Sequence, residues 1–412
     1  MEDLAQLGQR AQQASYSLGL LSTMQKNQVL LAMATALTTQ QDEILAANAK
    51  DLENPQVPEK FVDRLRLTAD RIEAMATGLK QVVALPDPIG NVDRAWRNEA
   101  GLMIAKERVP LGVIGMIFEA RPNVTVDASA LCFKTGNAVI LRGGKEAIHS
   151  NQALVQVLRG ALRANDMDEN AIQLITDTSH ATAEKFMQLT DYVDVLIPRG
   201  SARLIQTVLA KATVPVIETG AGNCHVYVDK DAQLQMATDI VINGKVQRPS
   251  VCNATEKLLI HQDVAAAYLP SMIQALRDQG VEVRGDQATQ AIVPDVVPAT
   301  DADWGTEYND LIIAVKVVDS EAAAIAHINR YNTQHSEAVV TDNYQAGKIF
   351  QQRVNAACVY INASTRFTDG FEFGFGAEIG ISTQKLHARG PMGLAELTSY
   401  KYVIDGNGQV RH

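Results

Sequence analysis

The sequence contains little cysteine. Its four cysteines (Cys132, Cys224, Cys252 and Cys358) lie far apart along 412 residues, and no two form a CxxC pair. This spacing excludes a disulfide framework and a zinc knuckle, and it is typical of reduced thiols in the cytosol. The eight histidines show no HExxH or comparable metal-ligand spacing. We therefore expect no metal site.

Long apolar runs and an excess of positive charge are also missing. No apolar run approaches the roughly 20 residues that a membrane helix needs. The first residues, MEDLAQLGQRAQQ, are polar with helical spacing, unlike a secretion signal. The net charge is −10, which does not favour a general nucleic-acid or membrane-surface binder. We expect a cytoplasmic protein with no nucleic-acid or membrane partner, whose local cations serve anionic small molecules.

The standard glycine motifs for phosphate binding are missing as well. No GxGxxG follows a predicted strand, and no Walker A sequence occurs. The segment GFGAEIG at 374–380 has three residues before its last Gly and follows a loop, so it does not match a dinucleotide fingerprint. A nucleotide would have to bind at other turns.

What is present indicates an α/β protein of two or three domains, because 412 residues that are 46% hydrophobic exceed one compact domain. Residues 1–85 have helical spacing, with a capping-box pattern at Ser22 and Gln25. From residue 111 onward, short apolar segments alternate with helical ones, which predicts parallel sheets covered on both faces. Strands are expected at 111–118, 138–142, 172–175, 193–197, 214–217, 225–228, 257–260, 311–318, 338–340 and 358–362.

Three further segments complete the predicted organisation. Residues 95–109 indicate a hairpin that turns near 99–101, and residues 398–406 indicate an edge strand. Residues 363–395 are rich in Gly, Phe and Thr, which is typical of a long functional loop.

The segment NGKVQRPSVCNATE, residues 243–256, places Cys252 among small and polar residues, downstream of Lys245 and Arg248. Nearby cations favour the thiolate, which is the form of cysteine that attacks a carbonyl carbon. A free cysteine more often serves only in packing. Both interpretations stay open on this segment alone.

Other polar groups follow predicted strands, where open α/β sheets bind ligands. The turns RGGK at 142–145 and PRGS at 198–201 could each hold an anion at a helix start, or be an ordinary turn and an ordinary N-cap. Asn123 could likewise cap a helix or donate to an oxyanion. Glu218 precedes a Gly-rich stretch and could be a cap, a solvated carboxylate or a catalytic group.

Taken in order, Arg121-Pro122-Asn123, LRGGKE at 141–146, Gly200-Ser201, Glu218, Cys252 and Glu307 resemble the aldehyde dehydrogenase superfamily. The resemblance runs from about residue 1 through the final strand. Longer segments are similar to the members that reduce gamma-glutamyl phosphate, namely EARPNVTVDASALCFKTGNAVILRGGKEA, VIETGAGNCHVYVD, VQRPSVCNATE and KLHARGPMGLAELTSYKY.

The resemblance implies an aldehyde dehydrogenase-like α/β fold with two doubly wound parallel-sheet domains and a small oligomerisation β-element. Residues 1–90 and 112–222 would form the NADP-binding domain and residues 223–392 the catalytic domain. Residues 91–111 and 393–412 would supply an oligomerisation hairpin and strand. A homo-oligomer is implied, with glutamate 5-kinase as a candidate partner.

The implied activity is the second step of proline biosynthesis. NADPH and gamma-glutamyl phosphate (L-glutamate 5-phosphate) would give L-glutamate 5-semialdehyde, NADP and phosphate through a Cys252 thioester. Asn123 and the Cys252 backbone N–H would form the oxyanion hole. The cofactor would be held by Arg142, Gly143, Lys145, Gly200, Ser201 and Glu307. Candidates for the substrate's anionic groups are Arg121, Arg248, Arg366 and Arg389.

Three departures from the superfamily pattern bear on these roles. Pro249-Ser250 replaces the usual Gly-Gln before the cysteine, and Ile205 replaces a Gly that usually follows Gly200 by five residues. Glu218 matches the base that activates water in aldehyde-oxidising relatives, a water that phosphate release does not need.

The alternatives are an NAD(P)-dependent aldehyde dehydrogenase that oxidises a free aldehyde, a cysteine hydrolase or transferase pairing Cys252 with His225 or His261, and a non-catalytic scaffold. The first predicts that Glu218 is essential and phosphate is irrelevant. The second predicts activity without a nicotinamide cofactor.

Overall fold

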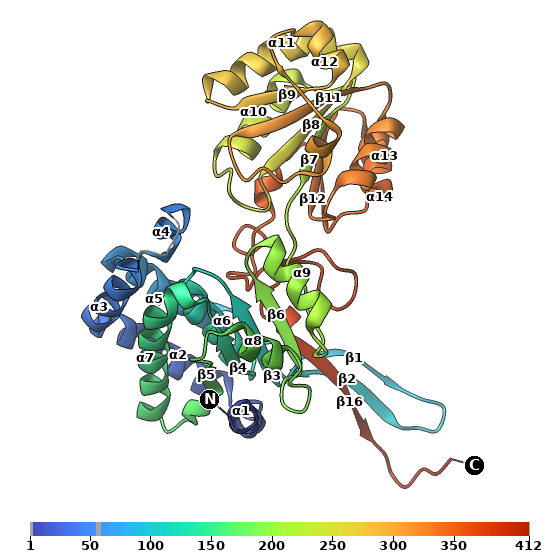
Figure 1. The fold of residues 1–412 in the computed structure, drawn as a ribbon. Helices are drawn as coiled ribbons and strands as arrows, with labels where there is room; N and C mark the ends of the chain where they lie inside the picture. Colours follow the sequence, from blue (N-terminus) through green and yellow to red (C-terminus); the bar gives the residue numbers. More distant parts are fainter. Residues whose placement is uncertain (1–2, 55–58, 412) are drawn as a thin grey trace. The chain divides into compact units, whose positions relative to one another are not determined.

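The computed structural model describes residues 3–54 and 59–411. Residues 1, 2, 55–58 and 412, which belong to the predicted segments 1–90 and 393–412, lie outside the described residues. The chain forms two compact units (Figure 1). The first unit contains residues 1–219, 374–380 and 392–412, and the second contains residues 220–373 and 381–391. Both are built on parallel sheets with helices, which confirms the predicted α/β class.

The first unit begins with helices, as the spacing of apolar residues predicts. They are α1 (Leu4–Leu18), α2 (Thr23–Thr39), α3 (Gln41–Leu52), α4 (Glu59–Leu65) and α5 (Ala69–Ala84). The capping box at the start of α2 is present, with Ser22 and Gln25 satisfying each other's backbone N–H groups. Helices α2 and α5 pack against each other, and their apolar stripes are buried.

A four-stranded parallel sheet of order β5-β4-β3-β6 forms the centre of this unit. Its strands are β3 (Val113–Phe118), β4 (Ala138–Arg142), β5 (Ile172–Leu174) and β6 (Val195–Arg199), connected through α6 (Asn123–Lys134), α7 (Ile148–Ala164) and α8 (His180–Met187), with α9 (Ala202–Lys211) following β6. All six residues of β3 are buried, because a parallel strand covered on both faces has no solvent side.

The predicted strand at 214–217 is wrong. Val216 forms a single isolated bridge with Leu196, flanked by hydrogen bonds from Leu196 N–H to the Pro215 carbonyl and from Ile217 N–H to the Leu196 carbonyl. Pro215 has no N–H group to continue a ladder, so the segment does not extend into a strand.

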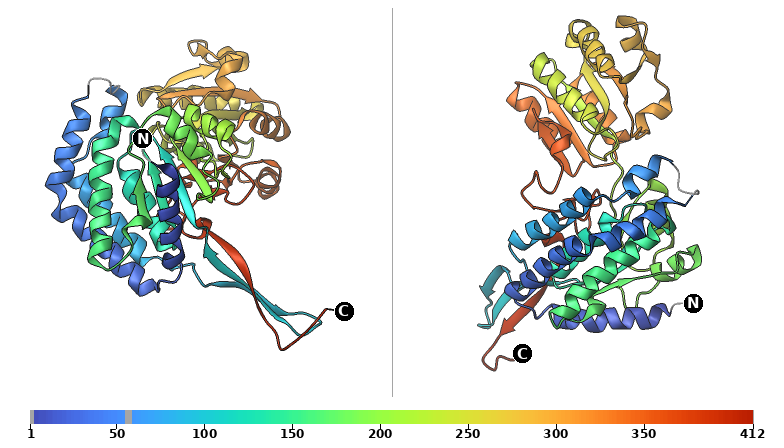
Figure 2. Two further views of the ribbon diagram at one scale, coloured as in Figure 1. Left: turned by 60° about the horizontal axis from the view of Figure 1, so that its bottom comes forward. Right: turned by 90° about the vertical axis from the view of Figure 1, so that its left-hand side faces the viewer.

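A separate antiparallel sheet also belongs to the first unit. It has the order β1-β2-β16, with β1 (Val92–Arg97), β2 (Met103–Pro110) and β16 (Thr398–Asp405). The hairpin between β1 and β2 closes near Gly101, which has a φ of +84°, and this confirms the predicted turn. Figure 2 shows the three strands as a narrow extended sheet, in which β16 returns from late in the chain to pair along β2.

The second unit contains a seven-stranded parallel sheet of order β10-β9-β11-β8-β7-β12-β13. Its strands are β7 (Cys224–Val228), β8 (Thr255–His261), β9 (Glu282–Gly285), β10 (Val297–Pro298), β11 (Ile312–Val318), β12 (Ser336–Val340) and β13 (Cys358–Ile361). The helices are α10 (Leu234–Val246), α11 (Gln262–Asp278), α12 (Gln287–Ile292), α13 (Glu321–Tyr331) and α14 (Tyr344–Arg353).

Alternate residues of its central strands enter two different cores. Val226 and Leu258 pack into one cluster with residues of α10 and α11. Tyr227 and Leu259 pack into the other with residues of α13 and α14. Because side chains alternate between the faces of a strand, this sheet is covered on both sides, as the predicted doubly wound arrangement requires.

The sequence analysis missed β9, α12, β10 and α14. Strand β9 has the sequence EVRG and only four residues, so its hydrophobic pattern is weak. Helix α14, YQAGKIFQQR, is mostly polar and buries only Gly347 and Phe350. Residues 363–395 contain only short elements, namely η4 (Thr365–Phe367), β14 (Ile381–Ser382), β15 (Gly390–Pro391) and the first residue of η5 (Ala395–Leu397), which agrees with the predicted loop.

Within the described ranges, no helix is long and apolar enough to cross a bilayer. The same ranges contain no group of three or more His, Cys, Asp or Glu side chains placed to hold a metal ion.

We predict that Asp51→Ala destabilises the first unit by about 2–3 kcal/mol, because the buried Asp51 carboxylate satisfies the start of α7. It accepts from the backbone N–H groups of His149 (3.1 Å) and Ser150 (2.7 Å) and from the Ser150 hydroxyl (2.6 Å). Asp51→Asn should cost less, since one acceptor oxygen remains. Chemical denaturation measures both, with the exposed Lys50→Ala as control. Equal decreases in the free energy of unfolding for Asp51→Ala and Lys50→Ala would contradict this explanation.

Candidate active site

Cys252 lies in a tight turn between α10 and β8 of the second unit. The Ala254 N–H donates to the Val251 carbonyl (3.0 Å), which closes the turn over Cys252 and Asn253. Cys252 is half-buried, whereas the other three cysteines are buried, and none of the four forms a disulfide. The most accessible thiol in the described chain is therefore the one with cations nearby in the sequence.

The turn is fastened to residues 364–368 by several hydrogen bonds. The Asn253 amide donates to the Thr368 carbonyl (2.9 Å), and the Thr365 hydroxyl donates to the Asn253 carbonyl (2.7 Å). The Asn253 side-chain oxygen accepts from the Arg366 guanidinium, which also donates through Nε to Gln247 (3.0 Å). Asn253, which directly follows Cys252, therefore fixes the position of Arg366.

Arg366 lies within electrostatic range of both Arg248 and Cys252. Burial, followed by the repulsion from Arg248, lowers the pKa of Arg366, but a guanidinium keeps its charge in proteins. Arg248 is exposed. Of the four predicted substrate arginines, Arg366 thus interacts electrostatically with the candidate nucleophile and with Arg248. Arg389 is exposed and donates to the Asn355 side chain (2.9 Å), and Arg121 belongs to the first unit.

Glu307 is connected to Cys252 through Gly222. The Glu307 carboxylate accepts from the Gly222 N–H (2.8 Å), and burial raises the pKa of Glu307. A Cβ atom on residue 222 would overlap the backbone carbonyl of Cys252, so this close approach requires glycine. The structure thus brings together Cys252 and the residue predicted to hold the nicotinamide ribose.

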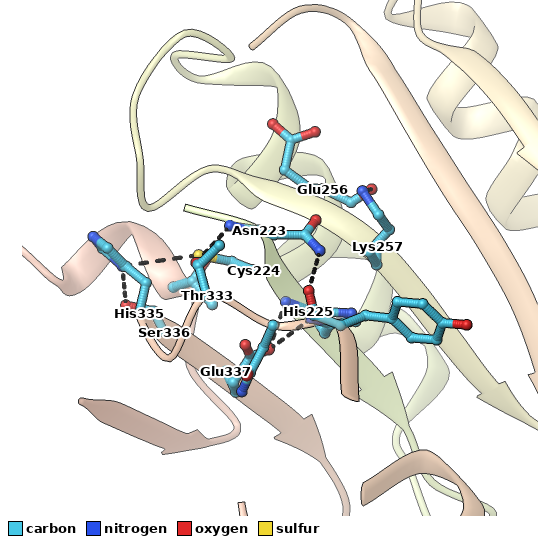
Figure 3. Close-up of polar contacts among 12 residues, drawn as sticks. Asn223, Cys224, His225, Glu256, Lys257, Thr333, His335, Ser336 and Glu337 are labelled. Carbon is cyan, nitrogen blue, oxygen red and sulfur yellow. Dashed lines mark hydrogen bonds and ion pairs between the residues drawn. The ribbon is translucent and has the colours of Figure 1, made fainter. Parts of the chain in front are cut away.

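Figure 3 shows a buried polar layer at the start of β7. The Cys224 thiol donates to the Cys252 carbonyl (3.2 Å), and its pKa is raised mainly by burial. His225 is bonded to Glu337 through both its backbone N–H (2.7 Å) and its Nδ1 (3.0 Å). Burial lowers the pKa of His225 and raises that of Glu337, so burial favours the neutral form of each.

This layer does not favour a cysteine hydrolase. His225 faces Glu337, and His261 accepts from Asp263 N–H (3.1 Å) as the N-cap of α11. Both proposed histidine partners of Cys252 have structural roles of their own. The hydrolase alternative predicted from the sequence therefore has no geometric support.

In the first unit, Asn123 is the first residue of α6, just beyond β3. Its amide donates to the Asp127 carboxylate one helical turn further on (3.0 Å). An amide carries two N–H donors, so one remains for an oxyanion. Burial raises the pKa of Asp127 to about 6, although the Asn123 hydrogen bond and the charge of Arg199 oppose this rise.

Arg142 is the last residue of β4, and one nitrogen of its guanidinium is already hydrogen-bonded. Its Nη2 donates to the carbonyls of Thr178 (2.6 Å) and Ser179 (3.4 Å). Its Nε is buried, and no acceptor among the described residues reaches it. Gly143 leaves no room for a side chain, since a Cβ would overlap the Asn151 amide. Lys145 is exposed at the start of the next short helix.

The start of α9 already binds a carboxylate. Glu119 accepts from the Ser201 N–H (2.8 Å) and from its hydroxyl (3.1 Å). A Cβ on Gly200 would come against this carboxylate. The Ser201 hydroxyl also caps α9 by accepting from Leu204 N–H. Sequence reasoning missed Glu119, and its position at the end of β3 was the only available signal.

Glu218 is half-buried in the first unit near the end of the segment that bridges to β6. Burial raises its pKa. The predicted residues therefore divide by unit, with Asn123, Arg142, Lys145, Gly200, Ser201 and Glu218 in the first, and Cys252, Glu307, Arg248 and Arg366 in the second.

We predict that iodoacetamide alkylates Cys252 first. Burial shields the other three thiols and raises their pKa values, which disfavours the reactive thiolate. Peptide mass spectrometry over time should give one fast site, and Cys252→Ala should remove the fast phase. Fast labelling of Cys358 instead would overturn this ranking.

We predict that Asp127→Asn raises the thermal unfolding temperature at pH 8 and has a smaller effect at pH 5.5. Asp127 binds its proton more tightly when folded (pKa about 6) than when unfolded (about 3.9). Its ionised form therefore costs stability, and that cost grows as the pH rises from about 4 to about 6.

The exposed Asp191→Asn is the matched control, since it removes the same charge without burial. Scanning calorimetry at the two pH values compares the variants. An equal temperature shift for Asp127→Asn at both values would show that the charge of Asp127 is not the cause.

Comparisons with known proteins agree with this arrangement. Residues 1–292 match the model of the aldehyde dehydrogenase family. The chain is 93% identical over 412 residues, covering 100% of both chains, to a gamma-glutamyl phosphate reductase of Lactiplantibacillus plantarum. It is 65% identical over 412 residues, covering 99% of both, to a protein of the same name from Enterococcus faecalis.

Solved structures give the same result. The crystal structure of gamma-glutamyl phosphate reductase from Thermotoga maritima has a TM-score of 0.98 at 48% identity, with 100% of both chains covered. An acetylating aldehyde dehydrogenase from Geobacillus thermoglucosidasius shares the fold, with a TM-score of 0.72 at 14% identity over 100% of both chains. A family match across most of the chain, together with full-length relatives of high identity, leads to one conclusion: this chain belongs to the aldehyde dehydrogenase family.

Proposed function

We propose that this chain reduces gamma-glutamyl phosphate to L-glutamate 5-semialdehyde with NADPH and releases phosphate, through a thioester at Cys252. The observation that carries the proposal is the accessible Cys252 thiol with Arg366 held beside it by Asn253. The full-length relatives named gamma-glutamyl phosphate reductase support the choice of substrate.

In the first step the Cys252 thiolate attacks the acyl carbon of gamma-glutamyl phosphate. The carbon–oxygen bond to phosphate breaks, phosphate leaves with the bonding electrons, and a thioester forms. An acyl phosphate is already activated, so the enzyme needs mainly to orient it and to stabilise the oxyanion. The free N–H of the Asn123 amide and the Cys252 backbone N–H would be the oxyanion donors.

The charges around Cys252 suit this substrate. Arg366 interacts electrostatically with both Arg248 and Cys252, and gamma-glutamyl phosphate carries a phosphate and an α-carboxylate. Guanidinium groups bind both anions with paired hydrogen bonds. We assign Arg366 to the substrate because Asn253, in the nucleophile turn, and Gln247 fix its position, whereas Arg389 donates to Asn355.

The first unit fits a dinucleotide phosphate. The Ser201 N–H and hydroxyl at the start of α9 donate to the Glu119 carboxylate; helix starts of this kind favour anions, and a pyrophosphate would have to displace Glu119 to use these donors. The buried Arg142 Nε has a donor to spare, and Lys145 is exposed nearby in sequence. These cations support NADP over NAD, because NADP carries an additional phosphate.

Residues of both units would bind the cofactor. Arg142, Gly143, Lys145, Gly200 and Ser201 would hold the cofactor phosphates and ribose, and Glu307 would hold the nicotinamide ribose. NADPH, when bound, supplies the hydride that reduces the thioester carbonyl. The Cys252 sulfur then leaves as thiolate, and the aldehyde is released. Residues 1–90 and 112–222 would thus serve as the cofactor domain and residues 223–392 as the catalytic domain.

The β1-β2-β16 sheet would make the oligomer contact of a cytoplasmic homo-oligomer. It exposes several large apolar side chains, including Val92, Tyr400, Tyr402 and Ile404. An exposed apolar edge is unfavourable in a monomer and favours pairing with another chain. A glutamate 5-kinase remains the proposed partner that would supply the unstable acyl phosphate.

Aldehyde oxidation to a free acid is the competing function. Burial raises the pKa of Glu218, and a carboxylate with a raised pKa suits a general base that activates water. The reductive reaction uses no such water, so the two functions differ in their need for Glu218 and for phosphate.

The reverse reaction tests the proposal. We expect NADP reduction with pyrroline-5-carboxylate to require inorganic phosphate, and we expect Cys252→Ala to lower the rate by at least about 10³-fold, since the nucleophile is lost. Glu218→Gln should retain activity and serves as the matched control. Phosphate-independent reduction that is lost in Glu218→Gln would overturn the proposal in favour of aldehyde oxidation.

A further inference from the structure

A group of buried charges flanks the nucleophile turn on both sides in the sequence. Glu256 and Lys257 occupy the start of β8, and Lys245 comes from α10; all three are fully buried (Figure 3 shows Glu256 and Lys257). Lys245 Nζ lies 3.2 Å from the Glu256 carboxylate. Charges in a protein interior cost stability unless they are paired. Packing alone therefore does not explain why this position carries three of them.

The group holds one short segment from both sides. Lys257 Nζ donates to the Thr306 carbonyl (2.7 Å). The Tyr308 N–H donates to the Glu256 carboxylate (3.2 Å), and Lys257 Nζ also lies 4.4 Å from the centre of the Tyr308 ring. The residue before Glu307 and the residue after it are thus each tied to β8.

The segment between these two ties is the one whose orientation matters for the proposed reaction. Glu307 reaches the Gly222 N–H (2.8 Å), and Gly222 lies directly against the Cys252 carbonyl. The path from Lys257 and Glu256 through Glu307 to Cys252 lies within the second unit. The buried ions hold the segment that carries Glu307. Glu307 in turn contacts Gly222, which lies against the nucleophile turn.

We infer that Glu256 and Lys257 are positioning residues, which hold residues 306–308 so that the Glu307 carboxylate faces Gly222 and the cofactor ribose. This inference rests on the proposed function, because it takes Glu307 to be a cofactor ligand. Neither Glu256 nor Lys257 touches the reacting atoms in this account, and both act through Glu307.

Burial disfavours the charged forms of both Glu256 and Lys257. Burial raises the pKa of Glu256 and lowers that of Lys257, although each partly offsets the effect on the other. Glu256 Oε1 has no hydrogen-bond partner among the residues described. Replacing a buried ion pair such as Glu256 and Lys257 by apolar side chains of similar size often leaves the free energy of unfolding unchanged. Stability alone therefore does not require these two residues.

The test is a double-mutant cycle on NADPH binding, measured by fluorescence titration without turnover. We expect Lys257→Met to raise the Kd for NADPH by about tenfold, the effect of roughly 1.4 kcal/mol. In a Glu307→Ala background, Lys257→Met should change the Kd no further, because both act through one carboxylate. Steady-state kinetics should show the same change in KM for NADPH, with a smaller change in kcat.

Lys316→Met is the matched control. Lys316 lies on the same sheet, with its Nζ 5.3 Å from the centre of the Trp304 ring, and its removal should leave the Kd for NADPH unchanged. Thermal unfolding shows whether each variant is folded. If Lys257→Met does not fold, Glu256→Gln enters the same cycle, since it keeps the volume and weakens the tie to Tyr308.

The outcomes separate the inference from the proposed function. If Glu307→Ala weakens NADPH binding while Lys257→Met and Glu256→Gln do not, the inference fails and the proposed function stands. Additive effects of Lys257→Met and Glu307→Ala would also overturn the inference, because they would show independent action. If Glu307→Ala leaves NADPH binding unchanged, the assigned role of Glu307 fails, and the inference fails with it.

Discussion

The close approach of the Gly222 backbone to the Cys252 carbonyl is the constraint on which the candidate site depends. No side chain fits at position 222, so two backbone segments meet directly. Next to it, the Gly222 N–H donates to Glu307, and the thiol of Cys224, the first residue of β7, donates to the Cys252 carbonyl. A methyl group at residue 222 would displace the nucleophile turn and the Glu307 contact together.

Around this contact, hydrogen bonds from several separate segments hold the nucleophile turn and the Glu307 segment in place. The nucleophile turn is fastened by Asn253 to residues 364–368, and the Glu307 segment is fastened by the first residues of β8. The hydrogen bonds of the nucleophile turn are buried and those of the Glu307 segment are part-buried; hydrogen bonds are stronger in a low-dielectric interior than in water. Rigid support of this kind is what a thiol nucleophile and its arginine need for orientation.

The sequence predicted the fold well where burial dominates. The apolar strands β3 and β4 and the apolar runs within β7 and β8 are buried in their sheets, and such segments are recognisable without partners. It failed where a local property changed the outcome. Pro215 prevented a strand that its apolar neighbours indicated, and β9 and α14 were too short or too polar to show a period.

For the site, the sequence could indicate residue types but not their partners. Cys252 and Glu307 were found through motifs, whereas Glu119, Asp127, Glu256 and Lys257 were not. Their significance depends on contacts between segments far apart in the chain, such as Glu119 with Ser201 or Lys257 with Thr306. Glu119 lies 82 residues before Ser201, the N-cap residue of α9 to which it is bonded. A contact over that separation cannot be recognised in a single sequence.

The order in which the two units are encoded has a consequence for synthesis. The second unit is complete once Pro391 has been made, but the first unit still needs residues 392–412, including β16. At about 5–20 residues per second on the ribosome, the earlier-encoded unit is therefore the later one to be finished. Until β16 arrives, one edge of β2 remains open, so the nascent chain carries an unpaired strand edge through most of its translation.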